Sequence, residues 1–109
     1  MVQHANKLKM GESVDIGAFT YINAKNGVTI GDNVQIGSHC SIYSISTIDN
    51  KHGPVVLEDN CKIGTHSVVM PNVRVGKNSM IGAFSFVVKD IPDSVVAFGV
   101  PAKIVKRIG

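Results

Sequence analysis

The sequence predicts an all-β protein, a parallel β-coil made of six-residue repeats, and two observations carry this prediction. The first is a period of six among the aliphatic residues, which differs from the 3.6-residue period of a helix and from the alternation of a single strand. Ile, Leu, Val and Met make up 34 of the 109 residues, yet one of them stands at all thirteen positions of the repeat. These positions are Met10, Ile16, Ile22, Ile30, Ile36, Ile42, Ile48, Leu57, Ile63, Val69, Val75, Ile81 and Val87.

The second observation concerns the residues between these aliphatic positions. In the unbroken stretch 55–88, a small or β-branched residue follows four places after the aliphatic one: Cys61, Ser67, Val73, Ser79 and Ser85. Glycine directly follows seven of the thirteen positions, and asparagine recurs two places later, which suits tight corners with left-handed backbone. Three such units per revolution would form a triangular parallel coil with strands stacked about 4.8 Å apart.

Two insertions break the count of six. Ile22 and Ile30 are eight residues apart, so two residues are added around 25–27, and Ile48 and Leu57 are nine apart, so three are added within 49–54. Insertions in a coil of repeats are extruded as loops, commonly on a functional face. The second insertion contains a histidine, an aspartate and a Gly-Pro turn, and we therefore expect the chemistry there.

The repeat ends after Val88, and the remaining residues 89–109 form a different kind of structure. A turn at 89–93, a strand at 95–98 and a second turn at 99–101 are followed by a predicted short helix at 102–108, which Pro101 would start. On that helix Lys103, Lys106 and Arg107 would share one face. The whole chain, 1–109, is predicted to be a single domain with its repeats over about 10–88.

Composition narrows the classes of partner. The net charge of +3 comes without a long basic stripe or interleaved aromatics, so we expect no nucleic acid, and the basic tail favours a small anionic ligand. The first residues lack the apolar run of a signal peptide, and no apolar stretch reaches about 18 residues, which predicts a cytoplasmic protein with no membrane partner. Cys40 and Cys61 fall on the small-residue position and are predicted to be buried thiols.

The segments IGDNVQIG, IGTHSVVMPNVRVGKNSMIGAFSFVVKDIPD and VVAFGVPAKIVKRI closely resemble the hexapeptide-repeat acyltransferases. Within that superfamily the chain is similar to the sugar O- and N-acetyltransferases of the galactoside and maltose acetyltransferase group. The resemblance implies a left-handed parallel β-helix, acetyl-CoA as the acetyl donor, and a homotrimer with active sites between neighbouring subunits. It predicts acetyl transfer to a hydroxyl, or less favourably an amino group, of a sugar or nucleotide-sugar.

Four histidines compete for the role of general base, which acetyl transfer to a hydroxyl requires. His4 precedes the repeats, and His39 and His66 occupy the corner position taken by asparagine in other units, where histidine tolerates positive φ. In relatives that carry a similar IGTHSVV segment, the histidine equivalent to His66 is not the base. His52 lies in the extruded loop where the related enzymes carry their catalytic histidine. We predict that His52 is the base, oriented by Asp49 or a backbone carbonyl.

The resemblance also implies residues for the coenzyme. The backbone amides of Thr65 and Ala83 match positions that meet the thioester and the pantetheine arm. Lys89, Lys103 and Lys106 match basic positions near the coenzyme phosphates, a role that clustered cations suit. Relatives often carry Trp where this chain has Lys62.

The sequence gives fewer indications of the acceptor molecule and of the alternative functions than it does of the coenzyme site. Asn23 lies near the place where galactoside-type enzymes contact their sugar and is the predicted acceptor residue. Phe84 and Phe86 fall outside the inward positions and would serve a sugar or, better, a partner subunit. A non-catalytic hexapeptide-repeat trimer is the alternative to an enzyme. A metal-dependent carbonic anhydrase of the same architecture needs two closely spaced histidines that this chain lacks, so we expect no metal.

Overall fold

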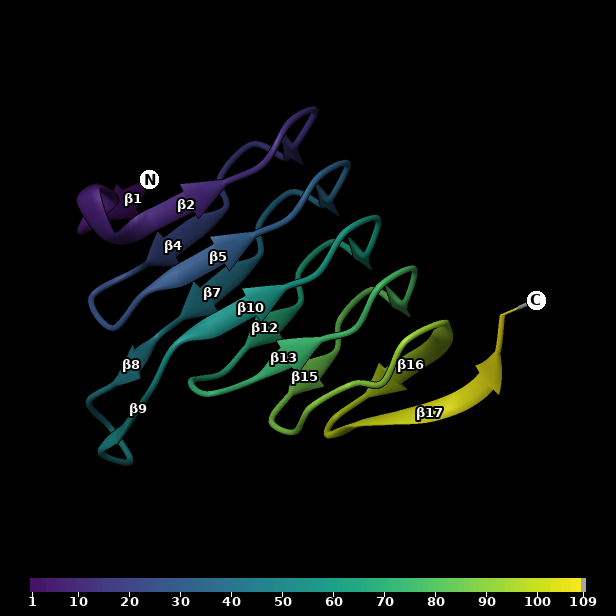
Figure 1. The fold of residues 1–109 in the computed structure, drawn as a ribbon. Coiled ribbons are helices and arrows are strands. Elements are labelled where there is room, and N and C mark those ends of the chain that lie inside the picture. The colour runs from purple at the N-terminus through teal and green to yellow at the C-terminus, as the bar shows by residue number, and fades with distance from the viewer. Residues whose placement is uncertain (109) are drawn as a thin grey trace.

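The computed structural model describes residues 1–108, and in it the chain winds through three sheets, parallel except for the last strand, that form the faces of a prism (Figure 1). Face A holds, in order, β1 (Val2–Gln3), β4 (Tyr21–Asn23), β7 (Ser41–Tyr43), β12 (Val68–Val69) and β15 (Phe86–Val87). Face B holds β2 (Leu8–Met10), β5 (Val28–Ile30), β10 (Val55–Leu57) and β13 (Arg74–Val75). Face C holds β3 (Asp15–Ile16), β6 (Gln35–Ile36), β11 (Lys62–Ile63), β14 (Met80–Ile81), β16 (Val95–Gly99) and β17 (Ala102–Arg107).

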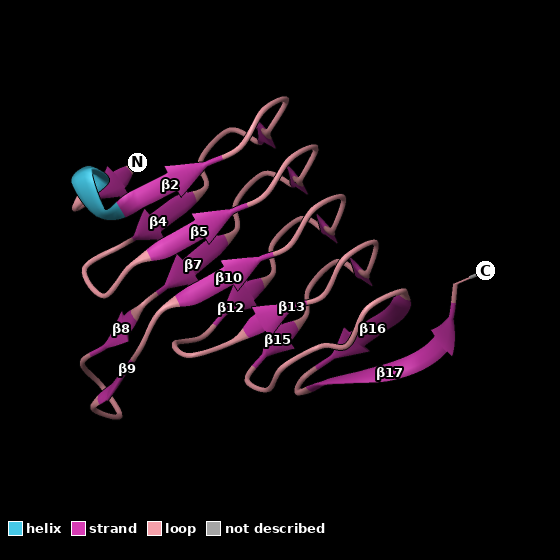
Figure 2. Ribbon diagram, in the orientation of Figure 1, coloured by secondary structure: helices cyan, strands magenta, loops and turns pink. Residues whose placement is uncertain are grey.

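Three short elements stand apart from the regular coil. A 3-10 turn, η1 (Ala5–Lys7), precedes the first full coil, and β8 (Ile45–Ser46) and β9 (Lys51–His52) form an antiparallel hairpin that leaves the prism (Figure 2). No helix among residues 1–108 is long and apolar enough to cross a membrane. The prediction of an all-β coil of hexapeptide repeats is therefore confirmed.

The interior is a stack of aliphatic side chains with small residues between them. Eleven of the thirteen predicted repeat positions are buried or half-buried, and the small-residue positions, Cys61 to Ser85, are buried as predicted. The buried serines bond to backbone carbonyls; Ser67 and Ser85, for example, donate to Gly82 O at 3.1 and 2.7 Å. A hydroxyl at this position therefore costs little, because its polar atom is paired.

Two predicted repeat positions are exposed. Met10 is 53% exposed because β2 is the end strand of face B and no coil covers it. Ile48 is 99% exposed, and its assignment to the repeat is wrong. Ile42 pairs with Val69, 27 residues later, whereas Val69 pairs with Val87 after 18. The insertion is thus nine residues long rather than three, and Ile48 matched the period by coincidence.

The corners adopt the left-handed backbone that the sequence predicts. Asn33, Asn60, Asn72 and Asn78 have φ between 59° and 66°. His39 and His66 have φ of 57° and 58°, which confirms their corner placement. The glycine before such a corner is needed for stacking: a Cβ at Gly64 would lie 2.5 Å from Ala83 N in the next coil.

The predicted C-terminal helix at 102–108 is wrong, since these residues form strand β17, antiparallel to β16 (Figure 2). The chain reverses after Gly99, whose φ of 114° favours glycine, and runs back along the last strand of face C. The exposed edge of β16 offers unpaired backbone groups, and pairing with them outweighs the weak helix preference of a seven-residue segment. Lys103 and Lys106 consequently lie on a strand, opposite Phe98 and Val96.

Candidate functional site

The hairpin β8–β9 projects from the corner between faces A and B (Figure 1). Its base is closed by Gly53, whose N–H donates to Ser44 O at 3.0 Å and whose carbonyl accepts from Asn72 N at 3.3 Å. Gly53 is required there, because its φ is 151° and a Cβ would lie 2.8 Å from Asn72 Cβ. The extruded loop predicted from the repeat is thus an ordered two-strand arm.

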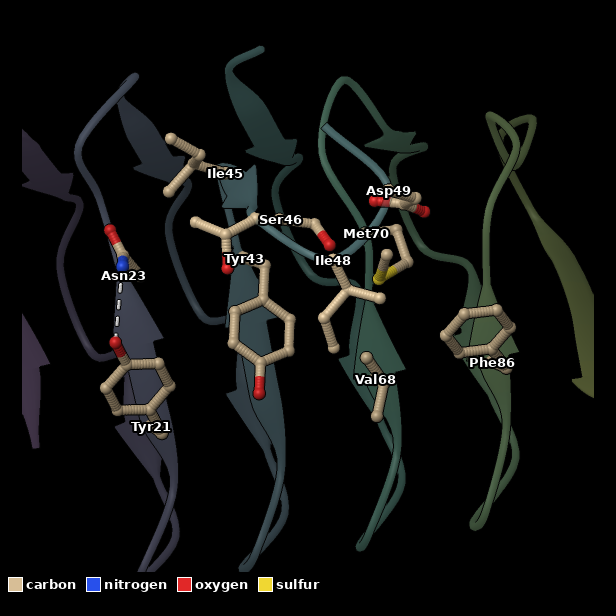
Figure 3. A pocket seen from close by; sticks show the side chains of 11 residues that line it. Tyr21, Asn23, Tyr43, Ile45, Ser46, Ile48, Asp49, Val68, Met70 and Phe86 are labelled. Atoms are coloured by element: carbon tan, nitrogen blue, oxygen red, sulfur yellow. Dashed lines mark hydrogen bonds between the residues drawn. The ribbon is translucent and has the colours of Figure 1, made fainter. Parts of the chain in front are cut away.

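Beneath the arm, face A carries a pocket of about 530 Å³ (Figure 3). Side chains from four neighbouring strands form its floor, and the arm from Ile45 to Asp49 forms its roof. The floor is aromatic and apolar: Tyr21, Tyr43, Val68 and Phe86. Sequence reasoning missed this pocket, because Tyr21 and Tyr43 occupy different places in their coils. Tyr21 pairs with Ser41, and Tyr43 pairs with Asn23, across β4 and β7.

Asn23, the predicted acceptor residue, lines this pocket and is held in a local network. Its side-chain N–H donates to Tyr21 Oη at 3.2 Å, and its Oδ1 accepts from Lys25 N at 3.1 Å. Tyr21 in turn donates to Gln3 Oε1 at 2.8 Å. The amide of Asn23 is therefore fixed in orientation, with most of its hydrogen-bonding capacity already used.

His52, the predicted base, lies on the other strand of the arm and does not line the same pocket. It borders a separate hollow of about 350 Å³ with Asn72 and Val88. Asp49 forms an ion pair with Lys51, at 3.7 Å, rather than with His52. Among residues 1–108 the His52 side chain has no hydrogen bond to a carboxylate or carbonyl, so its predicted orienting contact is not present.

Thr65 and Ala83 are brought together at the corner between faces C and A, which we call the open corner. Both line a groove of about 440 Å³ on face C, each directly after a corner glycine. Within residues 1–108 neither backbone N–H donates a hydrogen bond. The Thr65 hydroxyl donates to Ser38 O at 2.8 Å. Two neighbouring amides are thus left to donate to a ligand, as the predicted coenzyme role requires.

We call the corner between faces B and C the capped corner. There, backbone amides at the equivalent place, directly after a strand and its first corner residue, donate to side-chain carboxylates. Asp32 Oδ1 accepts from Glu12 N and Asp59 Oδ1 from Asp32 N, both at 2.8 Å. Asp93 Oδ1 accepts from Lys77 N at 2.9 Å. Here carboxylates from the next coil accept from the amides of Glu12, Asp32 and Lys77, so these three amides are not left for a ligand.

The three predicted phosphate-binding lysines are not gathered in one place. Lys103 and Lys106 lie on β17, in the sheet whose outer surface carries the groove with Thr65 and Ala83. Lys89 is exposed in the turn after β15, at the corner between faces A and B. Within a single copy of the chain, Lys103 and Lys106 can therefore contact the same ligand as Thr65, whereas Lys89 is less well placed to do so.

A column of stacked rings follows the open corner: Phe19, His39, His66 and Phe84. The two imidazoles lie 4.7 Å apart and 3° from parallel, and His66 and Phe84 lie 4.9 Å apart. Thr65 Oγ1 contacts His66 Nδ1 at 3.0 Å. The rings of His39 and His66 thus stack at the corner position that the sequence predicted for these two residues.

Cys40 and Cys61 are buried free thiols, as predicted. Burial raises the pKa of Cys61 to about 12, and the charge of Glu58 adds to this shift. Burial also raises the pKa of Cys40, against hydrogen bonds from backbone groups near Ser67 and His66. No group of three or more metal-ligating side chains occurs among the described residues.

Comparison with known proteins finds two hexapeptide-repeat families that match parts of the chain. The family "Bacterial transferase hexapeptide (six repeats)" matches residues 54–89, and "Hexapeptide repeat of succinyl-transferase" matches residues 27–50. Galactoside O-acetyltransferases from Lactococcus lactis and Escherichia coli are 35% and 37% identical to it over 90% of this chain. The chain spans only 55% and 56% of their lengths.

Solved structures agree with these sequence matches. A galactoside acetyltransferase in complex with coenzyme A superposes with a TM-score of 0.90 at 30% identity, covering 99% of this chain and 58% of that one. A hexapeptide-repeat acetyltransferase from Vibrio cholerae, complexed with acetyl coenzyme A, gives 0.92 at 25% identity, covering 99% and 64%.

Proposed function

Since the chain belongs to the hexapeptide-repeat acyltransferases, we propose that it is an acetyl-CoA-dependent acetyltransferase that acts on a hydroxyl or amino group of a sugar or nucleotide-sugar. The observation that carries the proposal is the open corner, where the N–H groups of Thr65 and Ala83 are unpaired beside a groove within residues 1–108. Such amides can hold the pantetheine arm and the thioester oxygen. We infer the left-handed winding of the coil from the same membership.

In the proposed reaction, the acceptor attacks the thioester carbonyl while the open corner donates hydrogen bonds to the oxygen that gains charge. Lys103 and Lys106 bind the coenzyme phosphates, with Lys89 as a further contact. Asn23 orients the acceptor in the pocket of face A. For a hydroxyl acceptor, His52 takes the proton as the new bond forms.

A homotrimer completes this site. The open corner joins faces C and A, whereas the arm leaves the corner between faces A and B, so one copy holds its coenzyme residues and its arm at different edges of the prism. Threefold packing would set the arm of one copy beside the open corner of the next. Lys89 lies at the same edge as the arm and would then approach the coenzyme of the neighbouring copy.

The experiment is release of free coenzyme A from acetyl-CoA in the presence of a panel of sugars and nucleotide-sugars. With a hydroxyl acceptor, His52→Ala should lower kcat/KM by about 10²–10⁴-fold, the range for a general base. His4→Ala is the matched control, since His4 is an exposed residue in the first coil, and it should leave kcat/KM unchanged. Retention of wild-type kcat/KM in His52→Ala would remove His52 from the site.

The alternative is a trimer that binds no coenzyme and transfers nothing. A thermal shift with acetyl-CoA separates the two, because a ligand that binds only the folded protein raises Tm. No shift at millimolar acetyl-CoA, together with no coenzyme release, would support the non-catalytic alternative.

A further inference from the structure

Resting on the proposed acetyltransferase function, we propose that the pocket beneath the arm selects an acceptor amine, which binds as its ammonium form against the carboxylate of Asp49. The proposal concerns the class of acceptor, an amino sugar rather than a sugar with only hydroxyl groups. It rests on the hydrogen-bonding groups, the aromatic walls and the reaction chemistry that the pocket offers.

Among the described polar side chains of the pocket, Tyr21 and Asn23 already use donors, Tyr43 and Thr47 keep their hydroxyls, and Asp49 offers only acceptors. Tyr21 already donates its proton to Gln3, and Asn23 donates to Tyr21 and accepts from Lys25 N. The pKa of Asp49 is lowered, chiefly by a hydrogen bond from the Ser46 hydroxyl, so the carboxylate is ionised at neutral pH. A carboxylate has about four acceptor sites, and an ammonium has three donors and no acceptor. A single hydroxyl would use fewer of these sites.

Charge and aromatic surface favour the same ligand. Asp49 is the one Asp, Glu, Lys or Arg among the described residues that line the pocket. The rings of Tyr21 and Tyr43 lie 5.7 Å apart on the floor, with Phe86 further along it, and the faces of such rings attract cations. Figure 3 shows Asp49 on the arm above Met70, with the three rings along the floor.

Among residues 1–108, Lys51 is the one cation that forms an ion pair with Asp49. Its Nζ lies 3.7 Å from Asp49 Oδ2, but both side chains are largely exposed, at 62% and 41%, and Lys51 does not line the pocket. Exposed ion pairs of this kind contribute little and are readily exchanged. An ammonium that also contacts the aromatic floor should therefore displace Lys51 from Asp49.

The chemistry of the two acceptor classes separates them further. No histidine lines the pocket among residues 1–108, and His52 borders a different hollow. A hydroxyl needs a base to take its proton as its oxygen attacks, whereas a neutral amine is nucleophilic enough to attack before it loses a proton. The ammonium first loses one proton to water; the nitrogen then bonds to the thioester carbon and the carbon–sulfur bond breaks. The second nitrogen proton is lost as the coenzyme leaves, and the coenzyme sulfur is protonated to the free thiol.

The test uses matched acceptors that differ by one group: glucose against its 2-amino, 3-amino and 4-amino derivatives, free and nucleotide-linked. We expect kcat/KM for at least one amine to exceed that of its hydroxyl counterpart by at least 100-fold. Asp49→Asn should raise KM for that amine by about 10- to 100-fold, the range for one charge-assisted hydrogen bond. Lys51→Ala is the matched control with the opposite sign, and it should lower KM, because the competing cation is removed.

Four outcomes overturn the inference, and they differ in what they leave of the proposed function. Equal or better transfer to a hydroxyl counterpart, or an amine KM within twofold of wild type in Asp49→Asn, overturns the inference and leaves the acetyltransferase function standing. Transfer to no amine while acetyl-CoA still raises Tm also overturns it, with coenzyme binding intact. Absence of both transfer and coenzyme binding overturns the proposed function itself, and the inference with it.

Discussion

Two corners of the prism have nearly the same backbone, but their backbone N–H groups differ in whether they are hydrogen-bonded. At the capped corner, side chains of Asp32, Asp59 and Asp93 accept hydrogen bonds from backbone N–H groups of adjacent coils. At the open corner, the N–H groups of Thr65 and Ala83 donate to nothing within residues 1–108, and small side chains leave room beside them. The repeat therefore pairs backbone amides at one corner and, within the described residues, leaves those of Thr65 and Ala83 free at the other. The difference lies in one residue per turn.

The largest effect should come from closing the open corner chemically. Ala83→Pro removes one free N–H, and proline suits this place in the turn, since Pro71 precedes Asn72 in an equivalent corner. We expect kcat/KM to fall about 100-fold or more, as for loss of one oxyanion donor. Steady-state kinetics with acetyl-CoA measure this, and an unchanged circular dichroism melt is the control. Normal kinetics in a folded Ala83→Pro protein would show that this amide serves no ligand.

The next effect is on stability and belongs to the capped corner. Asp93→Ala removes the cap on Lys77 N at 2.9 Å and the contact with Arg74 at 3.3 Å. We expect the free energy of unfolding to fall by about 1–3 kcal/mol. Guanidinium unfolding at fixed protein concentration measures it, and Asp93→Asn, which keeps an acceptor oxygen, should recover part of the loss. Coenzyme affinity should stay within twofold, and a larger change would mean that the two corners are not independent.

A smaller effect is expected from the basic strand beside the open corner. Replacing Lys103 and Lys106 together by alanine should raise the Kd for coenzyme A about 10-fold at low salt, since exposed charge pairs contribute about 0.2–1 kcal/mol each. The difference should shrink as salt screens the charges. Isothermal titration at two salt concentrations measures it, with Lys9→Ala on face B as the control. Equal affinities of variant and wild type would place the phosphates elsewhere.

The smallest effect concerns the two cysteines, one beside each corner. Because burial raises the pKa of Cys61 to about 12, its thiol should stay protonated and should not react with a disulfide reagent at pH 8 in the folded protein. In guanidinium both thiols should react. Since the folded pKa is above the unfolded one, Cys61 should lower stability only as pH rises above about 9. Rapid reaction of Cys61 in the native protein would contradict its burial.

Much of the fold followed from the sequence because the period of six has a local cause. Each buried aliphatic, each small inward residue and each asparagine corner repeats the same contacts, so Leu57 to Val87 were assigned correctly. The errors lie where the repeat stops. Ile48 fits the period but is 99% exposed on the arm, and residues 102–107 pair with the edge of β16 instead of forming a helix. Both cases depend on contacts between residues far apart in the sequence, which a local sequence pattern does not predict.

The sequence by itself determined the coil, its inward residues and the corner roles of His39 and His66, because a strand that stacks on its own copy needs the same residue types in each turn. Only the tertiary structure decided which residues share a site. It placed Thr65 with Ala83, put Asn23 and Asp49 in one pocket, and set His52 in another. The reason is geometric: neighbours across coils are 16 to 27 residues apart, and the length of one extruded arm fixes which of them meet.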